Sequence, residues 1–175
     1  KLLQAMIKID LTNLDQTSEL AYQRTLQIIL SRFGRPDETV INQLVAKIDP
    51  LFPSGSAEMN WLLCETLAWL ESPAIAQKAI AMIQSVPTQE EQMQYARSIR
   101  LLKAGWTDEL KEDYFEWFLK ATNYRGGASF AKFVEFIRDD ALASLSESQK
   151  ESLAEILAKK PEKKSALENL GEVFK

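Results

Sequence analysis

Apolar residues recur every three or four positions along most of this chain, and glycine or proline separates one such segment from the next. One segment shows the pattern clearly, with apolar residues at Tyr22, Leu26, Ile29, Leu30 and Phe33. This spacing places them on one face of an α-helix. Sustained alternation of apolar and polar residues is absent, as are the Asn-Gly and Asp-Gly turns of hairpins. The pattern therefore predicts an all-α protein.

Capping residues mark where the predicted helices begin, because their side chains accept hydrogen bonds from free backbone N–H groups of the first turn. Two capping boxes are predicted, Thr88 with Glu91 and Ser146 with Gln149. Further N-terminal caps are predicted at Ser56, Ser72, Thr107 and Ser129. Gly34 is a predicted C-terminal stop. Together these signals delimit about eight or nine helices of ordinary length.

The connections between these segments are short, which favours antiparallel packing of consecutive helices. Alternate helices begin near positions 18, 57, 88 and 129. HEAT and armadillo units repeat at about 40–47 residues. We therefore predict a HEAT- or armadillo-like, right-handed stack of antiparallel helical hairpins, an α-α superhelix. The residues themselves do not repeat clearly, so an irregular helical bundle remains the alternative.

The whole chain, residues 1–175, is interpreted as a single helical-repeat domain and as a fragment of a longer protein. Its last part, residues 159–175, is predicted to form a weak, charged terminal helix. Lysines concentrate there at Lys159, Lys160, Lys163 and Lys164. We interpret this concentration as a solvated helix end, with a docking patch as the alternative.

Composition narrows the chemistry, because the chain contains no histidine and a single cysteine, Cys64. The absence of histidine excludes Ser-His-Asp and Cys-His catalysis, imidazole metal sites and the usual proximal haem ligand. Cys64 lies in the apolar run WLLCETLAWL and is expected to be buried and structural. No catalytic residue, cofactor or metal ligand is therefore predicted, and carboxylate chemistry is the main catalytic route left open.

The formal charge of −4, with both signs interspersed, does not provide the basic face that nucleic-acid binding requires. No apolar stretch approaches the ~20 residues that span a bilayer. We therefore expect neither a nucleic-acid partner nor a membrane span. The expected partners are other domains of the parent chain or a separate protein, and the oligomeric state is left open.

Aromatic residues gather in one part of the chain, at helical spacing, and are predicted to form a core between two consecutive helices. A ligand or peptide groove is the alternative interpretation of this cluster. The predicted structural core consists of Trp61, Leu63, Cys64, Tyr114, Phe115, Trp117, Phe118, Phe130, Phe133 and Ile137. Polar residues on or beside apolar stripes are predicted to bridge neighbouring units: Asn60, Glu65, Arg97, Arg100 and Arg138.

Three long stretches of the chain resemble a known helical module. They are DPLFPSGSAEMNWLLCETLAWLESP (49–73), PTQEEQMQYARSIRLLKAGWTDELKEDYFEWF (87–118) and YRGGASFAKFVEFIRDDAL (124–142). The pattern resembles the HEAT-like module of large exported multidomain proteins of planctomycete-type bacteria. Those proteins also carry a c-type cytochrome domain and often a dehydrogenase-like β-propeller. The resemblance implies a periplasmic or exported setting. The haem-attachment motif belongs to another domain, so no redox role passes to these residues.

Three functions remain open at this point. The preferred one is a non-catalytic helical scaffold or interaction module within a larger exported, haem-containing redox protein. The second is a small-molecule or peptide-binding helical domain that uses the aromatic cluster. The third is a carboxylate-dependent hydrolase domain, which would require two carboxylates in one cleft, about 5–10 Å apart.

Overall fold

The computed structural model describes residues 1–160, and within them the chain is helical without a single strand. One 3-10 helix, η1 (Asp49–Leu51), accompanies ten α-helices. Their bounds are α1 (Leu2–Lys8), α2 (Gln16–Phe33), α3 (Glu38–Ile48), α4 (Ala57–Trp69), α5 (Ile75–Ser85), α6 (Gln89–Ile99), α7 (Asp108–Ala121), α8 (Phe130–Ala143), α9 (Glu147–Ser152) and α10 (Ala154–Ala158). The predicted all-α class is confirmed. Nearly all of the terminal helix predicted at 159–175 lies outside the described residues.

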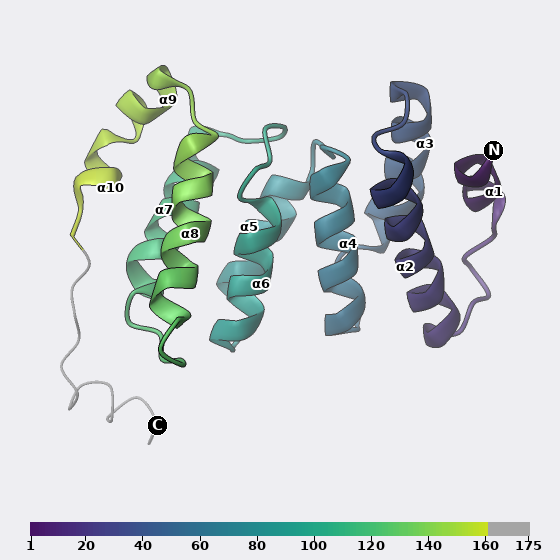
Figure 1. Cartoon of the computed structure of the whole chain (residues 1–175), viewed down its shortest axis with the longest axis horizontal. Coiled ribbons are helices and arrows are strands. Elements are labelled where there is room, and N and C mark those ends of the chain that lie inside the picture. The colour runs from purple at the N-terminus through teal and green to yellow at the C-terminus, as the bar shows by residue number, and fades with distance from the viewer. Residues whose placement is uncertain (161–175) are drawn as a thin grey trace.

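The helices stand side by side in an extended row, with the N-terminus at one end and α9 and α10 at the other (Figure 1). The helices α2, α4, α6 and α8 contact one another in that order and form one layer. On the other side, α5 packs on α7, and α7 packs on α10. The molecule is therefore a helical stack in which each helix contacts mainly its neighbours in the row.

Side-chain contacts show that the helices of the first layer run parallel to one another. In the middle of α2, Arg24 forms an ion pair with Glu58, which lies in the first turn of α4. Just after the end of α2, Arg35 donates a hydrogen bond of 2.7 Å to the carbonyl of Trp69, the last residue of α4. Because these two contacts advance along α2 and α4 in the same direction, the intervening α3 must return the chain to the starting side. Contacts between α4 and α6, and between α6 and α8, advance in the same way: Glu65–Arg97 then Glu71–Lys103, and Gln89–Arg125 then Arg100–Asp140.

Most of the predicted helix starts are confirmed by hydrogen bonds. The side chains of Ser56, Thr88, Thr107 and Ser146 each accept a bond from the backbone N–H three residues later. In the Ser146 capping box both bonds are formed: the Ser146 hydroxyl accepts from the N–H of Gln149, and the Gln149 side chain accepts from the N–H of Ser146. In the Thr88 box, the hydroxyl of Thr88 donates to the carboxylate of Glu91 at 2.7 Å. Gly34 ends α2 with a φ of 77°.

Two predicted caps are wrong. Ser72 lies three residues before α5, and its hydroxyl donates to the carboxylate of Asp49 at 3.0 Å, a partner distant in sequence. Ser129 has helical backbone angles and makes no side-chain capping bond. The turn before α8 is closed instead by the backbone bond from the N–H of Phe130 to the carbonyl of Gly127.

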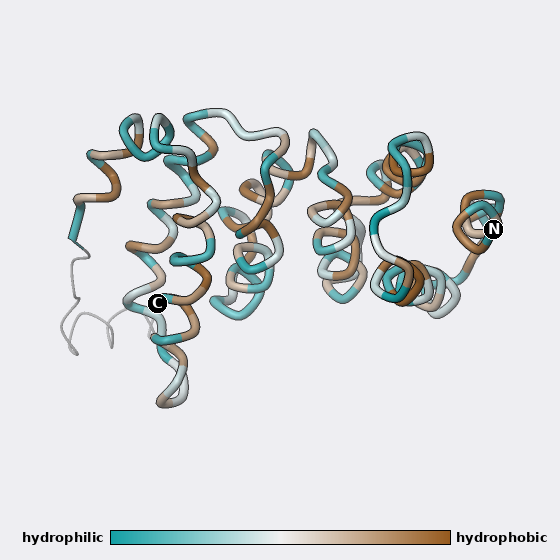
Figure 2. The backbone as a smooth tube through the Cα atoms, turned by 45° about the horizontal axis from the view of Figure 1, so that its top comes forward, coloured by the Kyte–Doolittle hydropathy of each residue, from teal (hydrophilic) through white to brown (hydrophobic). Residues whose placement is uncertain are grey.

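One continuous hydrophobic core runs along the row, from Met6 in α1 to Ile156 in α10. Figure 2 shows apolar and polar residues alternating along the helices, the pattern of helices with one buried and one solvated face. Within the described residues, no helix combines the length and the apolar character needed to cross a membrane.

Most of the predicted core residues are buried. Those below one-tenth exposure are Leu63, Cys64, Tyr114, Phe115, Trp117, Phe118 and Ile137. Trp61 and Phe130 are half-buried and pack against the core from its edge. The prediction for Phe133 is wrong, because its side chain is 40% exposed. Apolar residues occupy more than one face of α8, and its packed side carries Val134, Ile137 and Ala141.

Candidate functional site

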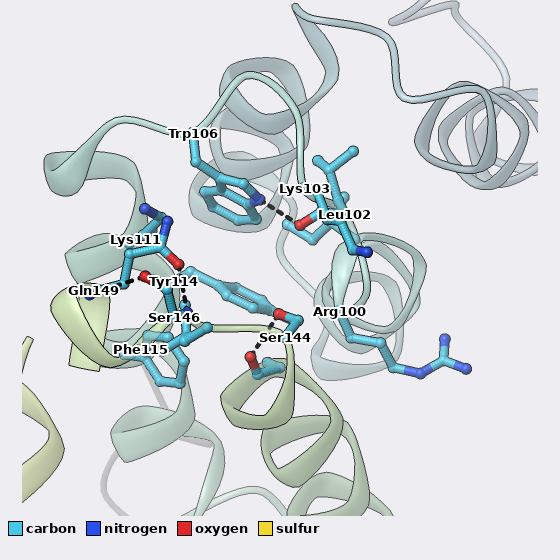
Figure 3. A pocket seen from close by; sticks show the side chains of 13 residues that line it. Arg100, Leu102, Lys103, Trp106, Lys111, Tyr114, Phe115, Ser144, Ser146 and Gln149 are labelled. Atoms are coloured by element: carbon cyan, nitrogen blue, oxygen red, sulfur yellow. Dashed lines mark hydrogen bonds between the residues drawn. The ribbon is translucent and has the colours of Figure 1, made fainter.

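A cavity of about 210 Å³ lies between the α6–α7 connection, the first half of α7 and the α8–α9 turn. We call it the α7 cavity and define it by its principal lining residues: Arg100, Lys103, Trp106, Lys111, Tyr114, Phe115, Ser146 and Gln149. Figure 3 shows Lys111, Ser146 and Gln149 on one side of it, with Arg100 and Lys103 on the other. Its lining includes aromatic rings and three cationic side chains, but no Asp or Glu.

The α6–α7 connection forms one wall of the cavity and is held by local bonds. The indole N–H of Trp106 donates to the carbonyl of Leu102 at 2.9 Å, which fixes the ring (Figure 3). The carboxylate of Glu71 accepts hydrogen bonds from the N–H groups of Lys103 and Ala104, at 3.0 and 2.8 Å. The wall is therefore anchored both within itself and to the α4–α5 connection, which contains Glu71.

Tyr114 forms the centre of the aromatic wall. Its ring centroid lies 5.5 Å from that of Trp106 and 5.0 Å from that of Phe118, the latter pair edge-on. Its hydroxyl donates to the carbonyl of Ala96 at 2.7 Å. Burial raises the pKa of Tyr114 well above its ordinary value. The phenol is thus a neutral, fixed part of the wall.

The three cations of the cavity differ in how they are paired. Arg100 forms an ion pair with Asp140 at 2.8 Å and donates to the carbonyl of Arg97, and its guanidinium points away from the aromatic rings (Figure 3). Lys103 is exposed and forms no ion pair within the described residues. Lys111 is only 7% exposed, yet its nearest carboxylate, the solvated Asp108, lies 4.0 Å away.

Gln92 is a second buried polar centre next to the aromatic wall. Its side-chain oxygen accepts hydrogen bonds from the indole N–H of Trp117, at 3.2 Å, and from the hydroxyl of Tyr124. Its amide nitrogen donates to the carbonyl of Val86 at 2.9 Å. One glutamine therefore joins α6, α7 and the segment after α7.

Three ion pairs connect successive helices of the α2, α4, α6 and α8 layer. They are Arg24–Glu58, Glu65–Arg97 and Arg100–Asp140, and we call them the ion-pair row. Glu65 also accepts a hydrogen bond from Gln27 of α2 at 3.3 Å. Glu65, Arg97 and Arg100, three of the residues selected from the sequence as bridges, thus connect neighbouring helices.

The other two proposed bridges do not connect units. Asn60 lies in the first turn of α4 and bonds both ways to the backbone of Ser54, at 2.6 and 3.0 Å. It therefore holds the connection that precedes its own helix. Arg138 is half-buried on α8 and makes no ion pair within residues 1–160. Among the described helices, α8 is the last of its layer, so no following helix offers it a partner.

Neither a metal centre nor a nucleophilic thiol is assembled by the described residues. They contain no group of three His, Cys, Asp or Glu side chains placed to hold a metal ion. Burial raises the pKa of the Cys64 thiol to about 12, which keeps the sulfur protonated and unreactive at neutral pH. The side chain itself is inaccessible.

Comparisons with protein-family models, curated proteins and solved structures give no significant match to this chain.

Sequence reasoning missed Lys111, although a signal for it exists. Lys111 precedes Tyr114, Phe115 and Phe118 by three, four and seven positions. That spacing places a lysine on the apolar stripe of its helix, where a charged side chain is unusual. Gln92 was missed for a different reason, because its partners Val86, Trp117 and Tyr124 all lie outside its own helix.

Proposed function

We propose that this chain is a non-catalytic helical scaffold that presents one face of its stack to a protein partner. The arrangement is of the HEAT-like kind, in which alternate helices run parallel and form a repeating layer. The observation that carries the proposal is the ion-pair row, which joins four parallel helices across one continuous face.

The ion-pair row suits recognition more than stability. Its side chains are between 32% and 58% exposed, and exposed ion pairs contribute little to folding, about 0–1 kcal/mol each. Held by their partners, however, these side chains lose less conformational entropy when a second protein docks on them. A face of alternating charge also rejects partners whose charges do not match.

The proposed setting is a larger exported protein, in which this chain holds neighbouring domains. It is supported by the resemblance of residues 49–73, 87–118 and 124–142 to the helical module of such proteins. In that setting the haem and any dehydrogenase-like activity belong to other domains, and this chain contributes no ligand or catalytic group to them.

The first test is to read the complete reading frame around this chain and to express its other domains separately. Binding of each domain to residues 1–175 is then measured by isothermal titration calorimetry. We expect Glu65→Arg to weaken the binding of a cognate domain at least tenfold, since it places like charges beside Arg97 and in the partner interface.

Glu147→Arg is the matched control, because Glu147 has the same charge and lies in α9, outside the ion-pair row. The control variant is expected to bind as the unaltered chain does. Equal binding by both variants would refute the proposal that the ion-pair row forms the partner-binding face. Turnover of a substrate by the isolated chain would refute the non-catalytic role.

A further inference from the structure

The α7 cavity has the chemistry of a small-ligand site, and this is independent of the scaffold function. We propose that it binds an organic carboxylate with a small apolar body, whose carboxylate pairs with Lys111. The apolar body would lie against Trp106 and Tyr114. The inference is carried by one juxtaposition: a buried, poorly paired lysine and an aromatic wall in a cavity without acidic residues.

Lys111 is the determinant of the site. Most of the Lys111 side chain is buried, and an ammonium in such surroundings is costly unless a counter-charge and hydrogen-bond acceptors surround it. Its only ion pair within the described residues, with Asp108, is at the 4.0 Å limit, and the Asp108 side chain is 77% exposed. No hydrogen bond from the Lys111 ammonium is formed within the described residues. An anionic ligand in the cavity would supply the missing acceptor.

Two neighbours complete the polar end of the cavity. The side-chain oxygen of Gln149 accepts a bond from the N–H of Ser146 at 2.9 Å, which orients the amide. The amide nitrogen of Gln149 is then left as a donor without a partner in the described residues, on the same side of the cavity as Lys111 (Figure 3). A carboxylate has two oxygens and can accept from both side chains.

The size of the cavity and the nature of its walls limit the rest of the ligand. A cavity of roughly 150 Å³ lined by apolar side chains holds one benzene molecule. The α7 cavity, at about 210 Å³, has room for one ring or a short branched chain and a carboxylate. Trp106 and Tyr114 supply flat apolar surface, whereas Arg100 is already committed to Asp140.

The test uses phenylacetate as the probe, with its neutral analogue phenylacetamide and with acetate, which lacks the ring. Binding to the full chain is measured by calorimetry and by the intrinsic fluorescence of its tryptophans, of which Trp106 lines the cavity. We expect phenylacetate to bind at least tenfold more tightly than either analogue. This comparison requires no variant, so it holds even where a substitution at Lys111 impairs folding.

A second arm tests Lys111 itself. Lys111→Met removes the charge and keeps the length, and we expect it to lower phenylacetate affinity at least tenfold. Lys132→Met is the control, because Lys132 is exposed on α8 outside the cavity. The affinity of this variant for phenylacetate should equal that of the unaltered chain. Equal affinity of phenylacetate and phenylacetamide, or unchanged affinity in Lys111→Met, overturns the proposal.

A third arm identifies the source of the carboxylate. A dipeptide ending in a free C-terminal phenylalanine is compared with phenylacetate and with the same dipeptide as an amide. Tighter binding of the free-acid dipeptide assigns the carboxylate to the end of a polypeptide. Tighter binding of phenylacetate assigns it to a free organic acid. Absence of binding by both acids refutes the site.

Discussion

Gly105 and Pro73 are in backbone contact across two connections that are distant in sequence. A Cβ atom at Gly105 would lie 2.1 Å from the carbonyl oxygen of Pro73, and Gly105 has a φ of +74°. Both facts require glycine, because no L side chain fits the space and few adopt that φ. The α4–α5 and α6–α7 connections therefore interlock at this point, and Glu71 reinforces it through the N–H groups of Lys103 and Ala104.

Gly105→Ala is expected to destabilise the chain by about 2–4 kcal/mol, through backbone strain and displacement of the Pro73 carbonyl. The free energy of unfolding is measured by urea denaturation followed by circular dichroism. Gly127→Ala is the control, since nothing lies within 4 Å of its Cβ position and its φ is not left-handed. A loss of similar size in both variants would contradict the interlock.

Gln92→Leu is expected to cost about 2–3 kcal/mol, because it leaves several buried partners without hydrogen bonds. Those partners are the indole N–H of Trp117 and the carbonyl of Val86, with the hydroxyl of Tyr124 beside them. The double variant Gln92→Leu, Trp117→Phe should lose less unfolding free energy than the sum of the losses of the two single variants. The reason is that no indole N–H then remains to be satisfied. Simple additivity of the unfolding free energies would show that the Gln92–Trp117 bond contributes nothing.

Trp117→Ala should lower the free energy of unfolding by about 3–5 kcal/mol, the usual cost of emptying a buried aromatic site. Trp117 is 5% exposed and packs edge-on against Phe118 at 4.9 Å. Phe133→Ala is the matched comparison, because this ring is 40% exposed, and its loss should stay below about 1 kcal/mol. Chemical denaturation of the two variants side by side tests the assigned burial, and equal losses would contradict it.

Alkaline pH should unfold the chain through its buried tyrosines. Burial raises the pKa of Tyr114 well above 10 and that of Tyr22 and Tyr95 to about 12. The folded state therefore favours the neutral phenols, and their contribution is complete below the unfolded pKa of 10.0. Stability is lost as pH rises from about 10 through the folded values.

The measurement is thermal unfolding at a series of alkaline pH values, together with tyrosinate absorbance. Tyr22→Phe and Tyr95→Phe should each reduce the loss of melting temperature between pH 10 and 12. Tyrosinate absorbance that develops around pH 10 while the chain remains folded would show that these phenols are accessible.

The helices could be predicted from the sequence because their signals are local. The caps at Ser56, Thr107 and Ser146 act on N–H groups three residues away, within the range that a sequence pattern covers. Ser72 failed as a cap because its hydroxyl bonds to Asp49, a competitor that only the folded chain brings near. Spacing alone does not reveal such long-range competition.

The core was predictable where an apolar stripe meets a neighbouring helix and not where it faces solvent. On α7 the aromatic residues are buried, whereas on α8 the apolar surface extends past the packed side and leaves Phe133 and Phe136 exposed. The α7 cavity lay beyond prediction, because it depends on how Ser146 in the α8–α9 turn and Gln149 in α9 come to lie on the side of Lys111.

The parallel layer has a consequence for how the chain acquires and loses its structure. Within the described residues, no side-chain hydrogen bond joins positions more than 43 apart in sequence, so closing each contact requires only a short loop. Folding can then start at any adjacent pair of helices and spread in both directions. The principal contacts of α1 are with α2 and α3 alone, so its amides should exchange with solvent earlier than those of α4 and α6.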